Sequence, residues 1–176
     1  GVILSKIETP PESRIPGVDD IQIFINAFGE YVAKSLHSKN RIHREYALRG
    51  IIDYYEEIPY DKQQLLSVVC QYMKRALKDI IPQIYFLGIE LLQKALSCSS
   101  DVKRAAIQHT VQPIIPLLLS MLGETNARKR NDAEQTIHIM AEKYVGPSLL
   151  FKYITKSEGK SQKADTKDKN WRHLYS

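Results

Sequence analysis

One eight-residue pattern occurs twice in this chain, at residues 40–47 and 126–133. Both copies begin with Asn, continue through a basic cluster that contains Arg, and end with Ala. Asn is a favoured residue at the start of a helix, so each copy has the composition of a helix start. The copies lie about two periods of forty-odd residues apart, which is the spacing of stacked helical-hairpin repeats. The pattern therefore predicts a solenoid rather than a globule built around one pocket.

Helical patterns follow one another from Asp19 onward, with apolar residues recurring three and four positions apart. The expected helices are 19–37, 40–57, 61–78, 82–97, 102–122, 126–144 and 148–154. Asp61 is expected to cap the third helix, and Pro82 to occupy the first turn of the fourth. Pro113 and Pro116 should kink or split the fifth helix, because each removes a backbone donor.

Small residues recur once per predicted hairpin, at Ala47, Gly88 and Ala133, each on the second helix. Close packing between helices is expected at these positions. Two helices in about 40 to 47 residues is the pattern of HEAT repeats. The predicted fold is therefore an all-α HEAT-repeat solenoid of antiparallel helix hairpins. An ordinary helical bundle with a chance match of the two phrases is the alternative.

Four regions follow from this pattern. Residues 1–18 carry Pro10, Pro11 and Pro16, which disfavour helix, so an extended leader is expected. Residues 19–154 form the repeat array. Residues 155–169 contain no large apolar side chain and predict a polar linker or loop, whereas residues 170–176 look like the start of a further helix.

Composition narrows the classes of function. Cys70 and Cys98 are the only cysteines, and the five histidines form no ligand motif, so neither a disulfide framework nor a metal site is expected. No phosphate-binding glycine loop or nucleophile elbow is present, which predicts a non-enzymatic protein without a cofactor. The longest apolar run, 114–122, is interrupted by Pro116 and Ser120, so we expect a cytoplasmic protein that does not span a membrane.

The basic residues concentrate at the turns inside the hairpins, which line up along one edge of a solenoid. Acidic residues at 56, 57, 61 and 101 fall at the opposite helix ends. With a net charge of +5, this placement predicts a basic ridge that docks an acidic protein surface. The expected ridge residues are Lys39, Arg41, Arg44, Lys78, Arg128 and Arg130. The alternative is a set of solvated helix ends, in which Arg44 or Arg130 braces the neighbouring repeat.

Three segments carry a resemblance to a known family: SKNRIHREYAL at 38–48, RALKDI at 75–80 and GETNARKR at 123–130. In this order and spacing they resemble a TOG domain, a HEAT-repeat array that binds tubulin through its intra-repeat turns. The likeness spans residues 19–154 and implies binding of the unpolymerised tubulin heterodimer, in microtubule growth or cilium assembly. It further implies a place at the cytoskeleton, centrosome or cilium. The family commonly has Trp in the first turn, where this sequence has Arg41.

Two other functions fit a HEAT-like array. The first is a protein–protein scaffold with a partner other than tubulin. The second is a HEAT-like DNA glycosylase, which needs a strongly basic concave face and a catalytic carboxylate with aromatic neighbours. A total charge of +5 is small for duplex binding, so nucleic acid is not the expected partner.

Overall fold

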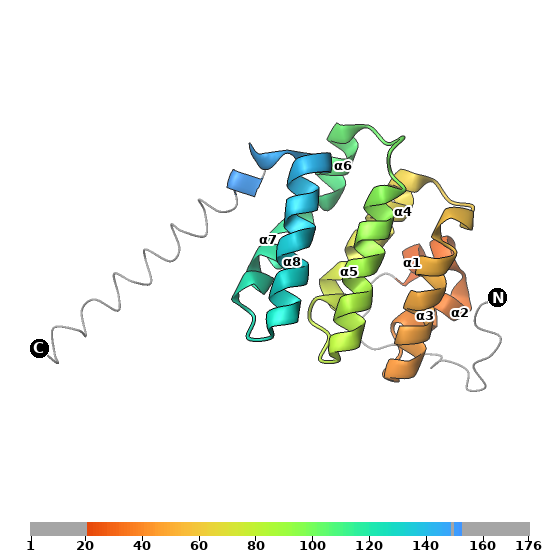
Figure 1. The fold of residues 1–176 in the computed structure, drawn as a ribbon. Helices are drawn as coiled ribbons and strands as arrows, with labels where there is room; N and C mark the ends of the chain where they lie inside the picture. Colours follow the sequence, from red (N-terminus) through yellow and green to blue (C-terminus); the bar gives the residue numbers. More distant parts are fainter. Residues whose placement is uncertain (1–20, 149, 153–176) are drawn as a thin grey trace, which may run out of the picture.

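The computed structural model describes residues 21–148 and 150–152, and this part of the chain contains helices and no strand (Figure 1). The α-helices are α1 (Gln22–Phe28), α2 (Glu30–Leu36), α3 (Arg41–Asp53), α4 (Lys62–Ala76), α5 (Pro82–Ser97), α6 (Arg104–Val111), α7 (Ile115–Ser120) and α8 (Ala127–Ile139). The predicted leader 1–18, linker 155–169 and helix start 170–176 lie outside the described residues. The last expected helix, 148–154, is helical where described, at 148 and 150–152.

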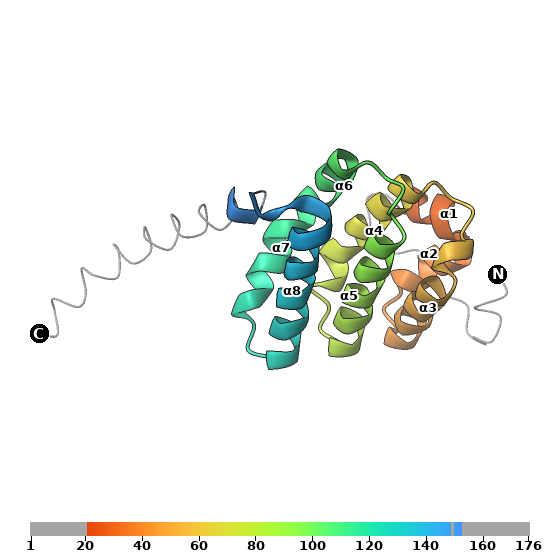
Figure 2. The same ribbon diagram turned by 45° about the horizontal axis from the view of Figure 1, so that its top comes forward.

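The helices form hairpins stacked in two layers. Helices α3, α5 and α8 lie side by side in one layer, and α2, α4 and α7 lie behind them in both views (Figures 1 and 2). Within the hairpins α2 contacts α3, α4 contacts α5, and α7 contacts α8. Neighbouring hairpins meet through α3 with α5 and through α5 with α8. The predicted all-α solenoid of antiparallel hairpins is confirmed.

The expectation of one helix from Asp19 to His37 is wrong, because the chain breaks at Gly29. This residue has φ +86°, a backbone conformation that residues with a Cβ rarely adopt. Its N–H still bonds to the Ile25 carbonyl oxygen at 2.8 Å, which ends α1. The break allows α1 and α2 to pack against different helices. Helix α1 contacts α4 as well as α2, while α2 packs on α3.

The other helix ends follow the expected capping chemistry. The Asn40 side chain accepts a hydrogen bond from the Ile42 N–H at 2.9 Å, and Asn126 accepts from the Lys129 N–H at 3.2 Å. Asp61 caps α4 by accepting from the Gln64 N–H at 3.0 Å. Pro82 occupies the first turn of α5. Side chains that satisfy the free N–H groups thus fix where three of the helices begin.

The fifth predicted helix is split at its prolines, as expected. A 3-10 helix, Gln112–Ile114, separates α6 from α7, and a second, Met121–Gly123, follows α7. By length and composition Arg104–Gly123 is the one segment among the described residues that could cross a membrane. In this fold Ile107, Val111 and Leu118 of that segment lie in the hydrophobic core.

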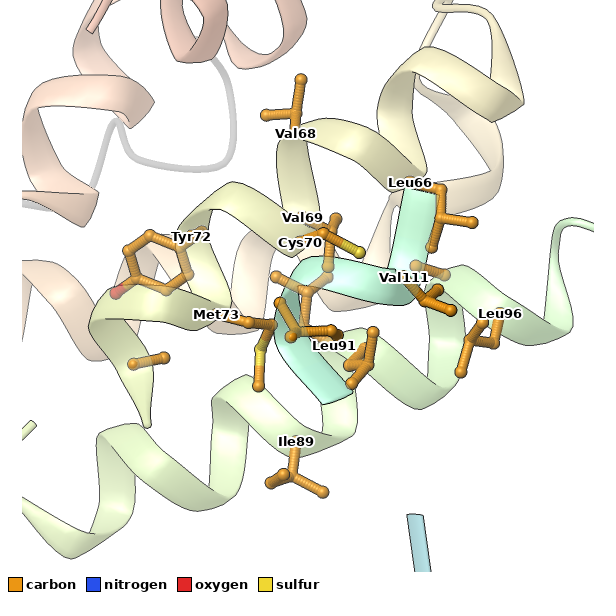
Figure 3. Packing of buried hydrophobic residues seen from close by; sticks show 14 of the residues in the cluster. Leu66, Val68, Val69, Cys70, Tyr72, Met73, Ile89, Leu91, Leu96 and Val111 are labelled. Carbon is orange, nitrogen blue, oxygen red and sulfur yellow. The ribbon is translucent and has the colours of Figure 1, made fainter. Parts of the chain in front are cut away.

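The core lies between the layers and is densest where α4 meets α5. Tyr72 and Met73 of α4, Leu91 of α5 and Val111 of α6 belong to one cluster of buried residues (Figure 3). A Cβ added at Gly88 would come within 2.8 Å of the Ala76 Cβ, closer than real Cβ contacts allow. Glycine at position 88 therefore sets how closely α4 and α5 approach, as predicted for this position.

Replacing Gly88 with Val should lower the free energy of unfolding by about 2 kcal/mol, because the added methyl groups overpack the α4–α5 contact. Urea unfolding followed by circular dichroism measures the change. Gly123→Ala is the matched control, because a Cβ there meets nothing within 4 Å. Equal unfolding midpoints for the two variants would contradict the close approach.

Candidate functional site

Three turns, each inside one hairpin, lie along the same edge of the array. They comprise residues 37–40, 77–81 and 124–126, which lead into α3, α5 and α8 at the lower side of Figure 1. We call these turns, with the first turn of the helix that follows each, the turn edge. Glu56, Glu57, Asp61 and Asp101 are all exposed and lie at the opposite helix ends, after α3, before α4 and after α5.

The twice-occurring sequence pattern forms the same structure in both copies. Arg44 is the fourth residue after the capping Asn40, and its Nη1 donates to the carbonyl oxygens of Ser38 and Lys39 at 2.9 and 3.0 Å. Arg130 is the fourth residue after Asn126, and its Nη1 donates to the carbonyl oxygens of residues 124 and 125 at 2.7 and 2.9 Å. The pattern thus encodes a turn closed by its own Asn and Arg.

Arg44 also joins the first turn to the second. Its Nε and Nη2 donate to the two carboxylate oxygens of Asp79 at 3.0 and 3.1 Å. Both side chains are nearly buried, with 11% and 9% of their surface exposed. Asp79 accepts one more hydrogen bond, from the Ile81 N–H at 2.9 Å. A bidentate ion pair that is largely shielded from solvent is stronger and more directional than an ion pair on the surface.

The second and third turns are joined by aromatic side chains of α5. The Tyr85 hydroxyl donates to the Lys129 carbonyl oxygen at 3.0 Å, and burial raises the pKa of Tyr85 to about 12, which keeps the donor protonated. The Arg128 guanidinium lies 3.8 Å from the centre of the Phe86 ring. Such a cation–π contact orients the side chain while leaving its donors available.

The structure brings all six predicted ridge residues to the turn edge, but it uses their side chains differently. Lys39, Arg41, Lys78 and Arg128 are exposed. None of these four forms an ion pair with a carboxylate in residues 21–148 and 150–152. Arg44 and Arg130 are partly buried. Arg44 braces the neighbouring repeat through Asp79, which is the alternative that the sequence left open, whereas Arg130 closes its own turn. Their direct contact with a partner stays a prediction.

Two exposed isoleucines on the turn edge were not anticipated from the sequence. Ile80 is 88% exposed and Ile42 is 58% exposed. Ile42 lies in the first turn of α3. The exposure of Ile80 could have been predicted, because this residue lies in the turn between the end of one helix and the Ile81-Pro82 start of the next.

Beneath the first turn, His37 is buried in an aromatic contact. Its ring meets the rings of Phe24 and Tyr72 edge-on, with centroids 4.6 and 5.9 Å apart. The Nδ1–H donates to the Ala33 carbonyl oxygen at 2.7 Å. Burial lowers the pKa of His37, and the nearby Arg75 charge lowers it further. The ring is therefore neutral and structural at physiological pH.

Two findings concern metal-binding and nucleophilic groups among the described residues. No group of three or more His, Cys, Asp or Glu residues among them is placed to hold a metal ion. Burial raises the pKa of the Cys70 thiol to about 12, so this cysteine is not a nucleophile at neutral pH. The turn edge presents exposed cationic side chains next to the exposed isoleucines, and the hydrogen bonds described above hold the turns in place.

The chain is similar to a known family of domains. The family model described as "Centrosomal protein CEP104, TOG domain" matches residues 19–148. The human centrosomal protein of 104 kDa is 26% identical over 125 residues, and the mouse protein is 25% identical over 138. These matches cover 66% and 74% of this chain but only 14% of each relative. The solved TOG domain of human Cep104 has the same fold, with a TM-score of 0.65 and 24% identity over 79% of this chain and 57% of that one.

Asp79→Ala should destabilise the protein by about 3 kcal/mol, because it leaves the shielded Arg44 guanidinium without its carboxylate partner. Thermal and urea unfolding measure the loss. Arg49→Ala removes the exposed pair with Glu45 and should cost less than about 1 kcal/mol. A loss for Asp79→Ala no larger than for Arg49→Ala would contradict the role given to the buried pair.

The stability of the protein should decrease as the pH falls below about 6.5, the ordinary pKa of His37. Because the folded state lowers this pKa, the unfolded chain binds the proton more readily, and acid therefore favours unfolding. His37→Phe keeps the ring packing and should flatten the pH dependence of the urea midpoint between pH 6.5 and 5. An unchanged slope in this variant would assign the pH dependence to other groups.

Proposed function

Because the chain belongs to the TOG-domain family of centrosomal protein CEP104, we propose that it is a non-enzymatic module that binds tubulin through its turn edge. The observation that carries the proposal is the set of exposed cations Lys39, Arg41, Lys78 and Arg128, which lie on one edge and have no carboxylate partner among the described residues. Exposed cations of this kind complement an acidic protein surface and accelerate association with it.

The rigidity of the turns supports the same proposal. Arg44 and Asp79 hold the first two turns in register, and the Tyr85 hydroxyl holds the third against α5. A surface that is ordered before binding loses less conformational entropy when it meets its partner. In this proposal Arg44 and Arg130 contribute chiefly by positioning the turns, and any direct contact they make with tubulin is secondary.

In this proposal the exposed isoleucines make the apolar contact with tubulin. The resembled family commonly uses a Trp of the first turn, and this chain has Arg41 at that place. Ile42 lies beside it and Ile80 lies on the next turn, both largely exposed. Burying either side chain at an interface would add favourable apolar area where the Trp is absent.

The cellular role follows the relatives, which are centrosomal proteins. The chain spans about one seventh of their length, matching 14% of each. We propose that the module acts in the cytoplasm, at the centrosome, the cilium or another part of the cytoskeleton, where it supplies unpolymerised tubulin for microtubule or cilium assembly.

The test is a titration of tubulin heterodimer with the protein, followed by size-exclusion co-elution at 50 and at 150 mM salt. Arg41→Glu/Arg128→Glu should weaken binding at least about tenfold, because it places two negative charges on the edge that faces acidic tubulin. Lys103→Glu/Lys143→Glu makes the same charge change at exposed positions away from the turn edge and should leave binding nearly unchanged.

Absence of any complex at both salt concentrations, for the wild-type protein and for a longer form extended at its C-terminus, would contradict the proposal. Equal weakening by the two charge reversals would show that net charge and not the turn edge governs binding. A HEAT-repeat scaffold with another partner is then the function to pursue.

A further inference from the structure

A basic groove extends from the first two turns of the turn edge to the space between α1 and α4. These two helices pack against each other at the N-terminal end of the array (Figure 2). The groove has a volume of about 710 Å³. Volumes of roughly 300–1,000 Å³ are usual for sites that bind ligands. We use the name basic groove for this cavity, which is lined chiefly by Ile23 and Phe24 of α1, Lys74 and Arg75 of α4, and Lys39 and Lys78 of the turns.

The charge of the basic groove is not neutralised within the described chain. Lys39, Lys74, Arg75 and Lys78 are exposed, and none of them has a carboxylate partner in the described ranges. The one carboxylate in the lining, Asp79, is already bound on both oxygens by Arg44. Four cations that converge on one cavity create a positive potential, which attracts an anionic ligand.

The floor of the basic groove is rigid and apolar. Phe24 and Tyr72 contact each other edge-on, with ring centroids 6.3 Å apart, and both pack on His37. The Tyr72 hydroxyl donates to the Leu36 carbonyl oxygen at 3.3 Å. The Tyr72 side chain is therefore fixed both by its ring contacts and by this hydrogen bond. At the rim, Ile23 is partly exposed and Ile80 is 88% exposed. The rim therefore offers apolar surface next to the cations.

The shape of the exposed surface favours a peptide over a nucleic acid. Proteins that bind single-stranded nucleic acids usually present exposed aromatic rings on which bases stack. Here the Phe24 and Tyr72 side chains are 5% and 1% exposed, so neither ring is available for stacking. The accessible apolar groups are the branched side chains of Ile23 and Ile80, which suit contact with another aliphatic side chain.

We propose that the basic groove is a second docking site, which binds an acidic linear peptide segment of a partner protein. The carboxylates of the segment meet Lys39, Lys74, Arg75 and Lys78, and an aliphatic side chain of the segment rests against Ile23 and Ile80. This site goes beyond the turn edge, because Lys74, Arg75 and Ile23 belong to helices α4 and α1 and not to the turns. It does not require that the partner be tubulin.

The test measures fluorescence anisotropy with a labelled decapeptide, Glu-Glu-Glu-Leu-Glu-Glu-Leu-Glu-Glu-Glu, titrated with the full chain at 50 mM salt. Saturable binding is expected. Lys74→Glu/Arg75→Glu should raise the dissociation constant at least about tenfold. Both residues are exposed, so the variant should fold, and circular dichroism with thermal unfolding checks that it does. Lys103→Glu/Lys143→Glu is the charge-matched control and should bind within about twofold of wild type.

Two further ligands test the chemistry of the site. Exchanging both leucines of the peptide for serine should weaken binding about fivefold, because the aliphatic contact is lost. A labelled ten-nucleotide oligothymidylate should bind more weakly than the leucine peptide. Equal binding of the leucine and serine peptides would overturn the proposal, as would tighter binding of the oligonucleotide or an unchanged affinity of the Lys74→Glu/Arg75→Glu variant.

A final comparison separates the basic groove from the turn edge. Arg41→Glu/Arg128→Glu changes residues outside the groove lining and should retain peptide binding to within about threefold of wild type. Retention by this variant, with loss by Lys74→Glu/Arg75→Glu, supports two sites, whether or not tubulin binds. Loss of the peptide by both variants to the same extent would overturn the separate site.

Discussion

The ion pair between Arg44 and Asp79 joins turns that lie 35 residues apart in the sequence, and the geometry of the turn edge depends on it. Each residue also forms hydrogen bonds within its own turn. Arg44 donates to two carbonyl oxygens of the first turn, and Asp79 accepts from the Ile81 N–H just before α5. The pair thus couples the start of α3 to the start of α5. Because both side chains are shielded from solvent, salt should screen this coupling less than it screens the exposed lysines around it.

The seam between the second and third hairpins uses different chemistry. A tyrosine hydroxyl bound to the Lys129 carbonyl oxygen, a guanidinium over Phe86, and a hydrogen bond from Gln93 to Thr136 at 3.0 Å replace the buried ion pair. None of these contacts uses a carboxylate. The cations of the third turn therefore keep their charge available to a partner, whereas the second turn has its only acid, Asp79, already neutralised. With the ion pair at the first contact between hairpins and the uncharged acceptors at the second, the turn edge keeps a net positive charge.

Local sequence determined what could be predicted. Asn40, Asp61, Asn126 and Pro82 mark helix starts because a cap requires only residues within the same turn. The family and its fold followed from the order of these local signals. The break at Gly29 could not be predicted in this way, because a glycine is compatible with an unbroken amphipathic pattern. The pairing of Arg44 with Asp79, and the outward position of Ile42, depend on which helix packs alongside, and a periodic pattern does not contain that information.

The break at Gly29 has a mechanical consequence. Because the chain breaks at Gly29, α1 packs against α4 of the second hairpin as well as against α2 of its own. The first two hairpins are therefore joined through α1 with α4 as well as through α3 with α5. A force that separates these two hairpins must break both contacts.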